Sequence, residues 1–383
     1  MGYDSLMTRT VVARLGLLCT ALIVAGIAAE LILRVSHLPG ITYHTFRYDD
    51  VTGQRFYPNT TLIYRSGRGE EVRRRVNRWG YLDRNHDTVK PAGVTRIGFF
   101  GDSFTEARQV PLDSTFFRRI ERADNAASGG EQTECIAIGI SGYGTLQSYL
   151  ECRRWMTPLS LDEVVYVFCE NDPANLVPAL NMSDTCPYPV RAGDSFTVDR
   201  SFATKYANKR RWPHRTWQYL KSHTLLFSTL ETRLHLLRRR GVRFHVATED
   251  RLMSAKPDHH EKPSYSSPPS ALPDSLRSLC ADLCGRVLLQ WKHDVESAGK
   301  RFVILYIPRG SEVAKAPGER DSWEKWLADF CRSNSIEMID PSDQFFRCAT
   351  HGEELFYDHL TSRGHAVLAA AFIATQQSDP AKP

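Results

Sequence analysis

Four separated segments of this 383-residue chain carry residues that could together support nucleophilic catalysis. Ser103 follows the apolar run at 97–100 in "IGFFGDSF", and His359 lies in "LFYDHLTSRGHAVLA" near the C-terminus. Between them come Gly142 in "IGISGYGT" and Asn171 in "FCENDPANL". An activated serine needs a base and donors aimed at the oxyanion that its attack creates. His359 is a candidate base, while the backbone N–H of Gly142 and the side chain of Asn171 are candidate oxyanion donors.

Apolar runs that alternate with helical stretches predict the elements that position these residues. Strands are predicted at 97–100, 135–140, 164–168, 302–307 and 337–339, and helices at 115–123, 145–156, 274–297, 321–334 and 361–376. Strands separated by helices form a parallel sheet with right-handed crossovers, so the expected fold class is a three-layer α/β/α sandwich. Because the carboxyl ends of parallel strands share one edge of the sheet, we expect the four residues to meet in one crevice.

In this order, the four segments resemble the SGNH or GDSL-type hydrolases, a family named for the serine, glycine, asparagine and histidine of four blocks. The match runs from residue 95 to about residue 377, with one interruption. The resemblance implies a flavodoxin-like SGNH fold in which Ser103 is the nucleophile and donates its own backbone N–H. It further implies that Gly142 and Asn171 complete the oxyanion hole and that His359 is the general base. The apolar N-terminal helix, "VNRWGYLDR" and "GDSFTEARQV" are together similar to the membrane-anchored, extracytoplasmic branch, which is often linked to polysaccharide or envelope modification.

Three positions differ from the family pattern. Ala137 stands where the second block often has an asparagine, and Cys169 replaces the usual glycine of the third block. Phe356 occupies the position three residues before the histidine, where the family commonly places the triad aspartate. The adjacent Asp358 is therefore the first candidate for the third catalytic residue.

Other groups could orient the imidazole in place of Asp358. Consecutive side chains in an extended chain point to opposite sides, so Asp358 reaches its neighbour's ring only if the loop curls. Glu354 is the other local carboxylate, and a serine–histidine dyad without a carboxylate is the third alternative. Asp102 is expected to cap the helix that follows the nucleophile, and His365 is expected to pack in the first turn of the last helix.

One apolar stretch near the N-terminus, residues 15–35, is long enough to span a bilayer. Arg9 and Arg14 precede it, which predicts a cytoplasmic N-terminus in a bacterial host. Small residues near its end leave a cleaved signal peptide as the alternative, although the run is long for one. The expected location is therefore a single-pass membrane protein with its catalytic domain in the periplasm or at the cell surface.

The pattern divides the chain into three parts. These are a cytoplasmic tip and transmembrane anchor (1–36), an irregular N-terminal extracytoplasmic subdomain (37–94), and a hydrolase domain (95–379) with an insertion or lid at about 174–273. The insertion contains a basic helical stretch at 215–240 that is expected to pack on its own domain. Its His259 and His260 lie in a polar tract and are expected to be solvated rather than metal-bound.

Composition limits the partners and cofactors. The net charge is +5, from 49 basic and 44 acidic residues, and the basic residues occur in short clusters, so no part of the chain is basic enough to indicate nucleic-acid binding. The inferred chemistry needs no cofactor, and no cluster of residues predicts a metal site. Eight of the nine cysteines lie outside the anchor, where disulfides are permitted without a fixed pairing. Cys135 and Cys169 lie in or beside strands and are expected in the core.

Three functions remain open from the sequence. The leading hypothesis is a serine esterase that removes acyl groups, such as acetyl, from an envelope or exported glycan, with an acylated carbohydrate or another small ester as substrate. An O-acyltransferase would use the same site and pass the acyl group to a sugar hydroxyl. A non-catalytic glycan-binding or scaffold protein is the third hypothesis, which the altered positions 137, 169 and 356 favour. The intact nucleophile and oxyanion residues favour an enzyme.

Overall fold

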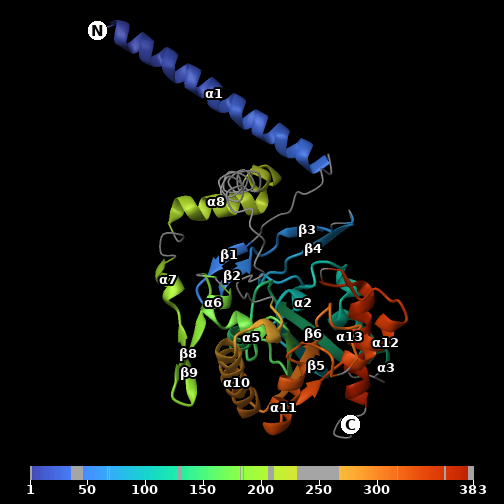
Figure 1. Ribbon diagram of the computed structural model, residues 1–383. Coiled ribbons are helices and arrows are strands. Elements are labelled where there is room, and N and C mark those ends of the chain that lie inside the picture. Colours follow the sequence, from blue (N-terminus) through green and yellow to red (C-terminus); the bar gives the residue numbers. More distant parts are fainter. Residues whose placement is uncertain are drawn as a thin grey trace, which may run out of the picture.

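The computed structural model contains a central sheet of five parallel strands (Figure 1). The structure describes residues 2–35, 46–66, 68, 70–127, 132–181, 183, 185–205, 211–230, 267–316, 318–357 and 359–377. The strands are β5 (Val94–Gly101), β6 (Gln132–Gly139), β7 (Glu163–Cys169), β10 (Arg301–Ile307) and β11 (Glu337–Ile339). They lie in the order β6-β5-β7-β10-β11, which is the order of flavodoxin-like sheets. All five predicted strands are confirmed.

Helices cover both faces of this sheet and produce three layers. On one face lie α4 (Thr145–Trp155), α5 (Asp172–Asn175), α10 (Asp274–Ser297) and α11 (Glu324–Ser333). On the other lie α3 (Phe116–Ala127), α12 (Ser342–Thr350) and α13 (Ser362–Gln377). The short α2 (Ser103–Glu106) and the 3₁₀ turn η1 (Leu112–Ser114) follow β5. The predicted α/β/α class is confirmed.

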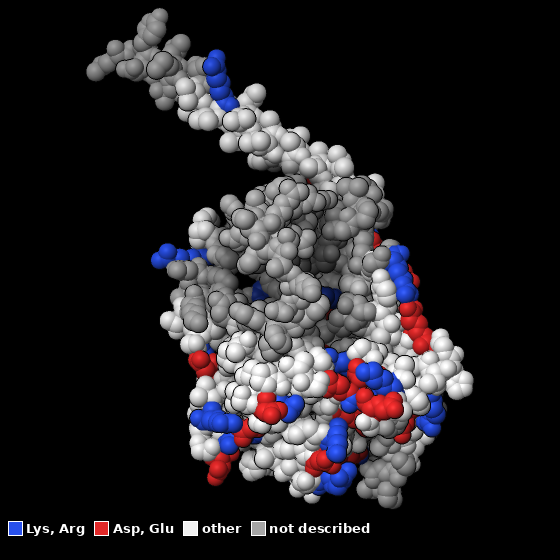
Figure 2. Space-filling view, viewed as in Figure 1, with Lys and Arg blue, Asp and Glu red and all other residues white. Residues whose placement is uncertain are grey.

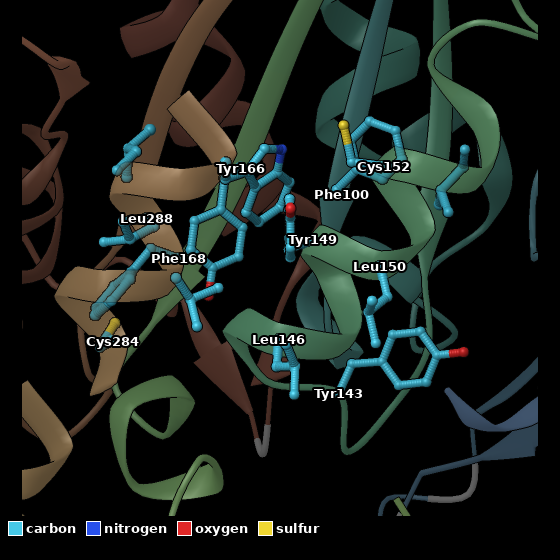
Figure 3. Close-up of a cluster of buried hydrophobic side chains, with 14 of the residues drawn as sticks. Phe100, Tyr143, Leu146, Tyr149, Leu150, Cys152, Tyr166, Phe168, Cys284 and Leu288 are labelled. Atoms are coloured by element: carbon cyan, nitrogen blue, oxygen red, sulfur yellow. The ribbon is translucent and has the colours of Figure 1, made fainter. Parts of the chain in front are cut away.

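Neighbouring residues of each strand supply the two separate cores. Phe99 of β5 points to the face covered by α3 and α13, with its ring centroid 5.2 Å from that of Phe116 and 5.6 Å from that of Phe372. Phe100 points the other way, and its ring lies 6.2 Å from that of Trp291 on α10. Figure 3 shows part of the core on the α4 and α10 face, where side chains of these two helices meet those of β5 and β7. Strands buried on both faces are almost continuously apolar, which made them recognisable in the sequence.

The predicted helices differ from the observed ones mainly at their ends. Helix α10 has the predicted bounds, whereas α3 continues four residues beyond 123 and α11 begins three residues after 321. The nine-residue α12 was absent from the prediction. Helix ends depend on capping contacts that hydrophobic periodicity does not reveal.

Two antiparallel hairpins precede the sheet, so the prediction of an irregular segment between the anchor and residue 94 is wrong for this part. They pair β1 (Phe46–Asp49) with β2 (Gly53–Phe56), and β3 (Thr61–Arg65) with β4 (Glu71–Arg75). Strands of four or five residues give little alternation to detect, and β4 reads "EVRRR". The turn predicted in "VNRWGYLDR" is confirmed: Asn77 Oδ1 accepts hydrogen bonds from the backbone N–H groups of Trp79 and Tyr81, both at 3.0 Å.

The described part of the insertion adds further short elements. These are α6 (Pro178–Asn181), the antiparallel pair β8 (Tyr188–Ala192) and β9 (Ser195–Asp199), α7 (Ser201–Lys205), α8 (Trp212–His223) and the 3₁₀ turn η3 (Pro269–Ala271). Of these, β8 and β9 contact α10, and α8 contacts β1. Arg191 of β8 pairs with Asp282 of α10 at 2.7 Å, which attaches the hairpin to the main domain. His259 and His260 lie outside the described residues, as does the predicted basic helix beyond residue 230. The domain boundaries at 36 and 94 stay predictions.

The N-terminal helix α1 (Gly2–Val35) projects away from the domain (Figure 1). Its residues Val11–Val35 have a mean hydropathy of 2.3 and are long and apolar enough to cross a membrane or to act as a signal sequence. Figure 2 shows this helix as mostly uncharged, whereas basic and acidic side chains are mixed over the visible face of the domain. The Glu30 carboxylate accepts hydrogen bonds from Leu225 N at 3.1 Å and Leu226 N at 2.8 Å, so the end of α1 contacts the insertion.

Candidate active site

The turn after β5 places Ser103 at the carboxyl edge of the sheet. Asp102 caps α2, since its Oδ1 accepts the hydrogen bond of Phe104 N at 2.9 Å, and this prediction is confirmed. The chain turns so tightly that a Cβ on Gly101 would lie 2.4 Å from Thr105 Oγ1. The strand therefore ends in glycine, and the next helix begins at the serine, whose side chain lines a pocket.

His359 reaches this serine from the other end of the chain. It lies on β13 (His359–Leu360), which pairs with β12 (Phe356–Tyr357) in a short hairpin ahead of α13. Its Nε2 lies 2.8 Å from Ser103 Oγ, and its ring centroid is 5.0 Å from that of Phe104. A serine hydroxyl at this distance can pass its proton directly to the imidazole.

The two predicted oxyanion residues follow the neighbouring strands β6 and β7. Gly142 has φ +84°, a left-handed conformation that favours glycine. Asn171 Nδ2 donates a hydrogen bond to Asp102 Oδ2 at 3.4 Å, so the amide lies next to the nucleophile's turn. Both residues line the same pocket as Ser103 and His359, which has a volume of about 870 Å³.

The sheet order explains why these residues converge. Strand β5 lies between β6 and β7, and the loops that follow these three strands carry Ser103, Gly142 and Asn171 at the point where the winding of the sheet reverses. The chain has the flavodoxin-like sheet order and the converging residues that the resemblance to the SGNH-type hydrolases predicts. The catalytic roles of its individual residues, and the membrane-anchored branch, remain predictions.

No family model and no curated protein matches this chain. Among solved structures, it resembles the acetyl xylan esterase AlAXEase, with 12% identity, a TM-score of 0.39 and coverage of 73% of this chain and 98% of that chain. A lipase/acylhydrolase from Enterococcus faecalis is 13% identical, with a TM-score of 0.36 and coverage of 76% and 100%. A lipolytic protein of the G-D-S-L family from Veillonella parvula is 11% identical, with a TM-score of 0.36 and coverage of 75% and 100%.

The residues considered as partners of His359 lie in different places. Asp358 is outside the described residues. Glu354 binds Arg68 through both oxygens, at 2.6 and 2.8 Å, and this exposed pair lowers the pKa of Glu354. The Phe356 ring packs against the Phe104 ring, with 6.4 Å between centroids.

His365 packs in the core as predicted. Its Nδ1 accepts a hydrogen bond from Phe116 N at 3.3 Å, and its ring stacks on that of Phe116. Burial, together with the charges of Arg74 and Arg119, lowers the pKa of His365 to about 3, so the ring is neutral at physiological pH. A neutral imidazole is the form that can accept this hydrogen bond.

The two other departures from the family pattern are accommodated below the site. The Ala137 side chain is buried in the core, while its backbone N–H donates to Asp83 Oδ2 at 2.9 Å. Cys169 is a buried free thiol whose Sγ lies 3.1 Å from both Asp102 Oδ2 and Asn171 Oδ1. Burial and the Asp102 charge raise the pKa of Cys169 well above its ordinary value, so the thiol keeps its proton and can donate it to these oxygens.

Asp102, Cys169 and Asp172 form a compact group of potential metal ligands, with ligand atoms within 4.8 Å of one another. Asp172 accepts hydrogen bonds from Tyr166 Oη at 2.6 Å and Cys169 N at 2.9 Å. Burial and the Asp102 charge raise the pKa of Asp172 well above its ordinary value. Together with the contact between Cys169 Sγ and Asp102 Oδ2, these hydrogen bonds connect the end of β7 to the turn that carries Ser103, so the group supports that turn.

Several pocket residues were missed by the sequence analysis. Thr52 and Gln54 come from the β1–β2 hairpin, Asn181 and Thr185 from the insertion, and Arg309 from the loop after β10. Each is a single polar residue in a segment with little periodicity. No signal in the sequence relates these segments to the crevice, because their position depends on packing between parts far apart in the chain.

Glu170 lines the same pocket and is expected to make stability depend on pH. Burial raises its pKa to about 7, even though Trp323 N donates to its two oxygens at 2.9 and 3.1 Å. The folded protein therefore holds this proton more tightly than the unfolded chain. The free energy of unfolding should fall by about 3 kcal/mol as the pH rises from about 4.5 to 7.

The Glu170→Gln variant removes that proton and should show a flatter dependence of the free energy of unfolding on pH. Urea denaturation at pH 5, 6, 7 and 8 measures the difference from the wild type. Glu319→Gln, at an exposed glutamate, is the matched control. Parallel curves for Glu170→Gln and the wild type would show that Glu170 is ionised throughout this range.

Proposed function

We propose that this protein is a serine esterase that acts through an acyl-Ser103 intermediate and removes short acyl groups, such as acetyl, from an envelope or exported glycan. The 2.8 Å contact between Ser103 Oγ and His359 Nε2, inside a pocket also lined by Gly142 and Asn171, carries the proposal. A binding protein has no need of a nucleophile and a base in hydrogen-bond contact.

In the proposed reaction, Ser103 Oγ attacks the ester carbonyl carbon and its proton moves to His359 Nε2. The backbone N–H groups of Ser103 and Gly142 and the Asn171 side chain stabilise the negative oxygen of the tetrahedral intermediate. The bond to the alcohol oxygen then breaks, and His359 gives that oxygen the proton. Water attacks the acyl-serine with His359 again as base, which releases the carboxylic acid and restores the hydroxyl.

The walls of the pocket favour a polar substrate with a small acyl group. Amide side chains such as Gln147 and Asn175 and the guanidinium groups of Arg108 and Arg309 line it. Sugar hydroxyls can accept hydrogen bonds from the guanidinium groups and can both donate to and accept from the amides, whereas a long acyl chain can do neither. The pocket therefore fits an acylated carbohydrate. The apolar α1 is consistent with a membrane-attached enzyme whose domain faces the envelope.

Labelling with a fluorophosphonate probe tests the activated serine. The full-length protein in detergent should be labelled stoichiometrically, and mass spectrometry should place the label on Ser103. Ser103→Ala should abolish labelling, whereas Ser311→Ala, at a pocket serine that contacts Glu312, should not change it. A folded wild type that takes up no label would contradict the proposal and favour a glycan-binding role.

Acetylated oligosaccharides then separate the two enzymatic outcomes. Release of acetate without an acceptor establishes an esterase. Acetate that instead appears on an added acceptor sugar, with little release into water, would establish an O-acyltransferase that uses the same acyl-serine.

A further inference from the structure

The N-terminal β1–β2 hairpin contacts the loop that carries the candidate oxyanion donor. Gln54 of β2 donates a hydrogen bond from Nε2 to the carbonyl oxygen of Ser141 at 3.1 Å. This carbonyl and the N–H of Gly142 belong to one planar peptide group. Gln54 is therefore bound to the opposite end of the peptide whose N–H is proposed to face the oxyanion.

Buried contacts hold Gln54 in this position. The Tyr143 hydroxyl, from the same loop, donates to the backbone carbonyl of Gln54 at 2.7 Å and lies 2.8 Å from Thr52 Oγ1. On the other side, Gly53 approaches the insertion so closely that a Cβ would lie 2.0 Å from the Thr185 carbonyl oxygen. Strand β2 is thus held between the loop that contains Gly142 and the insertion.

The loop itself is held from a second direction. Ser141 N donates to Glu106 Oε2 at 2.5 Å, and Glu106 is buried on α2, three residues after the candidate nucleophile. Gly142 has no side chain to fill the space near Gln54, whose Nε2 would be 3.9 Å from a Cβ placed there. The Gln54 contact restricts rotation of the peptide between Ser141 and Gly142, and the Glu106 contact holds the peptide that precedes it.

We propose that Gln54 is a positioning residue for the oxyanion hole, supplied to the catalytic domain by the N-terminal hairpin. An oxyanion donor is effective when its direction is fixed before the reaction. A hydrogen bond to the carbonyl fixes the peptide plane and polarises the amide, so that its N–H becomes a stronger donor. This inference rests on the proposed esterase function, and it adds a part of the chain that the four family blocks do not include.

Kinetics of the full-length protein with p-nitrophenyl acetate test the role of Gln54. Gln54→Met keeps a similar length but has no donor, and Gln54→Glu is nearly isosteric and presents a carboxylate to the carbonyl oxygen. Both should lower kcat about 10-fold, less than the loss of an oxyanion donor itself, with KM changed by less than about twofold. Inhibition by a trifluoromethyl ketone, which forms a tetrahedral adduct, should weaken by a similar factor.

Two controls separate this role from loss of structure and from failure of the proposed function. Gln132→Met, at an exposed glutamine where β6 begins, should have wild-type kinetics. Fluorophosphonate should still label Ser103 in both Gln54 variants, and the near-UV circular dichroism spectra of both should match that of the wild type. If Gln54→Met fails to fold, the kinetics of Gln54→Glu test the role of Gln54. A kcat within twofold of the wild type in a folded variant would overturn the role of Gln54 and leave the esterase intact. A folded wild type without turnover or labelling would overturn both.

Discussion

Replacing Ser103 or His359 with alanine is expected to lower kcat/KM for p-nitrophenyl acetate by about 10⁴-fold or more. The two side chains act as one unit because the 2.8 Å contact lets the hydroxyl lose its proton as it attacks. The double variant should therefore lose no more activity than either single variant, whereas independent contributions would multiply. Initial rates with the full-length protein in detergent measure all three losses.

His293→Ala, at an exposed histidine on α10, is the matched control and should retain wild-type activity. The His359 variant carries the sharper test, because a serine without its base can still be a weak nucleophile. If His359→Ala retains more than a tenth of the wild-type rate while Ser103→Ala is inactive, a group other than His359 removes the proton.

The parts of the fold that the sequence predicted are those governed by local pattern. The C-terminal half of β5 and almost all of β7 and β10 are apolar because both faces are covered, so the positions of these strands follow from their apolar runs. The crevice could then be predicted because parallel strands share a carboxyl edge. Ser103 and His359 are 256 residues apart in sequence, but the predicted order of strands and helices places both in loops at the same edge of the sheet.

The remaining features depend on contacts between distant segments. Gln54 reaches Ser141 across 87 positions, and its short strand has no alternation that marks it. The pairing of Glu354 with Arg68 joins the histidine loop to the tip of β3–β4, and neither residue differs in sequence from an ordinary surface charge. The family pattern identified the four blocks but could not indicate which outer segments complete the pocket.

A buried charge network connects the N-terminal segment to the sheet beneath this site. The Asp83 side chain is fully buried. Its Oδ2 accepts a hydrogen bond from Ala137 N at 2.9 Å and lies 3.0 Å from His86 Nε2. Its Oδ1 lies 3.3 Å from Arg118 Nη2. Burial alone would raise the pKa of Asp83, but the Arg118 charge and the His86 hydrogen bond hold it well below its ordinary value. The carboxylate is therefore charged in the folded protein and joins "VNRWGYLDR" to β6 and α3.

Asp83→Asn should lower the free energy of unfolding by about 3–5 kcal/mol at pH 7, because it leaves the buried Arg118 guanidinium without this carboxylate. The pKa of Asp83 is lower in the folded than in the unfolded chain, so its stabilisation is present above the unfolded pKa and is lost as pH falls through the folded one. The difference between the variant and the wild type should therefore be constant from pH 7 to about pH 5 and begin to narrow below about pH 4, near the ordinary pKa of an aspartate. Urea denaturation at pH 3 to 7 measures this onset, with Asp87→Asn, at an exposed ion pair with Arg78, as control. A loss below about 1 kcal/mol would mean that Glu121, 2.8 Å from Arg118, is enough to compensate the Arg118 charge. The N-terminal segment would then be attached to the sheet mainly by apolar packing.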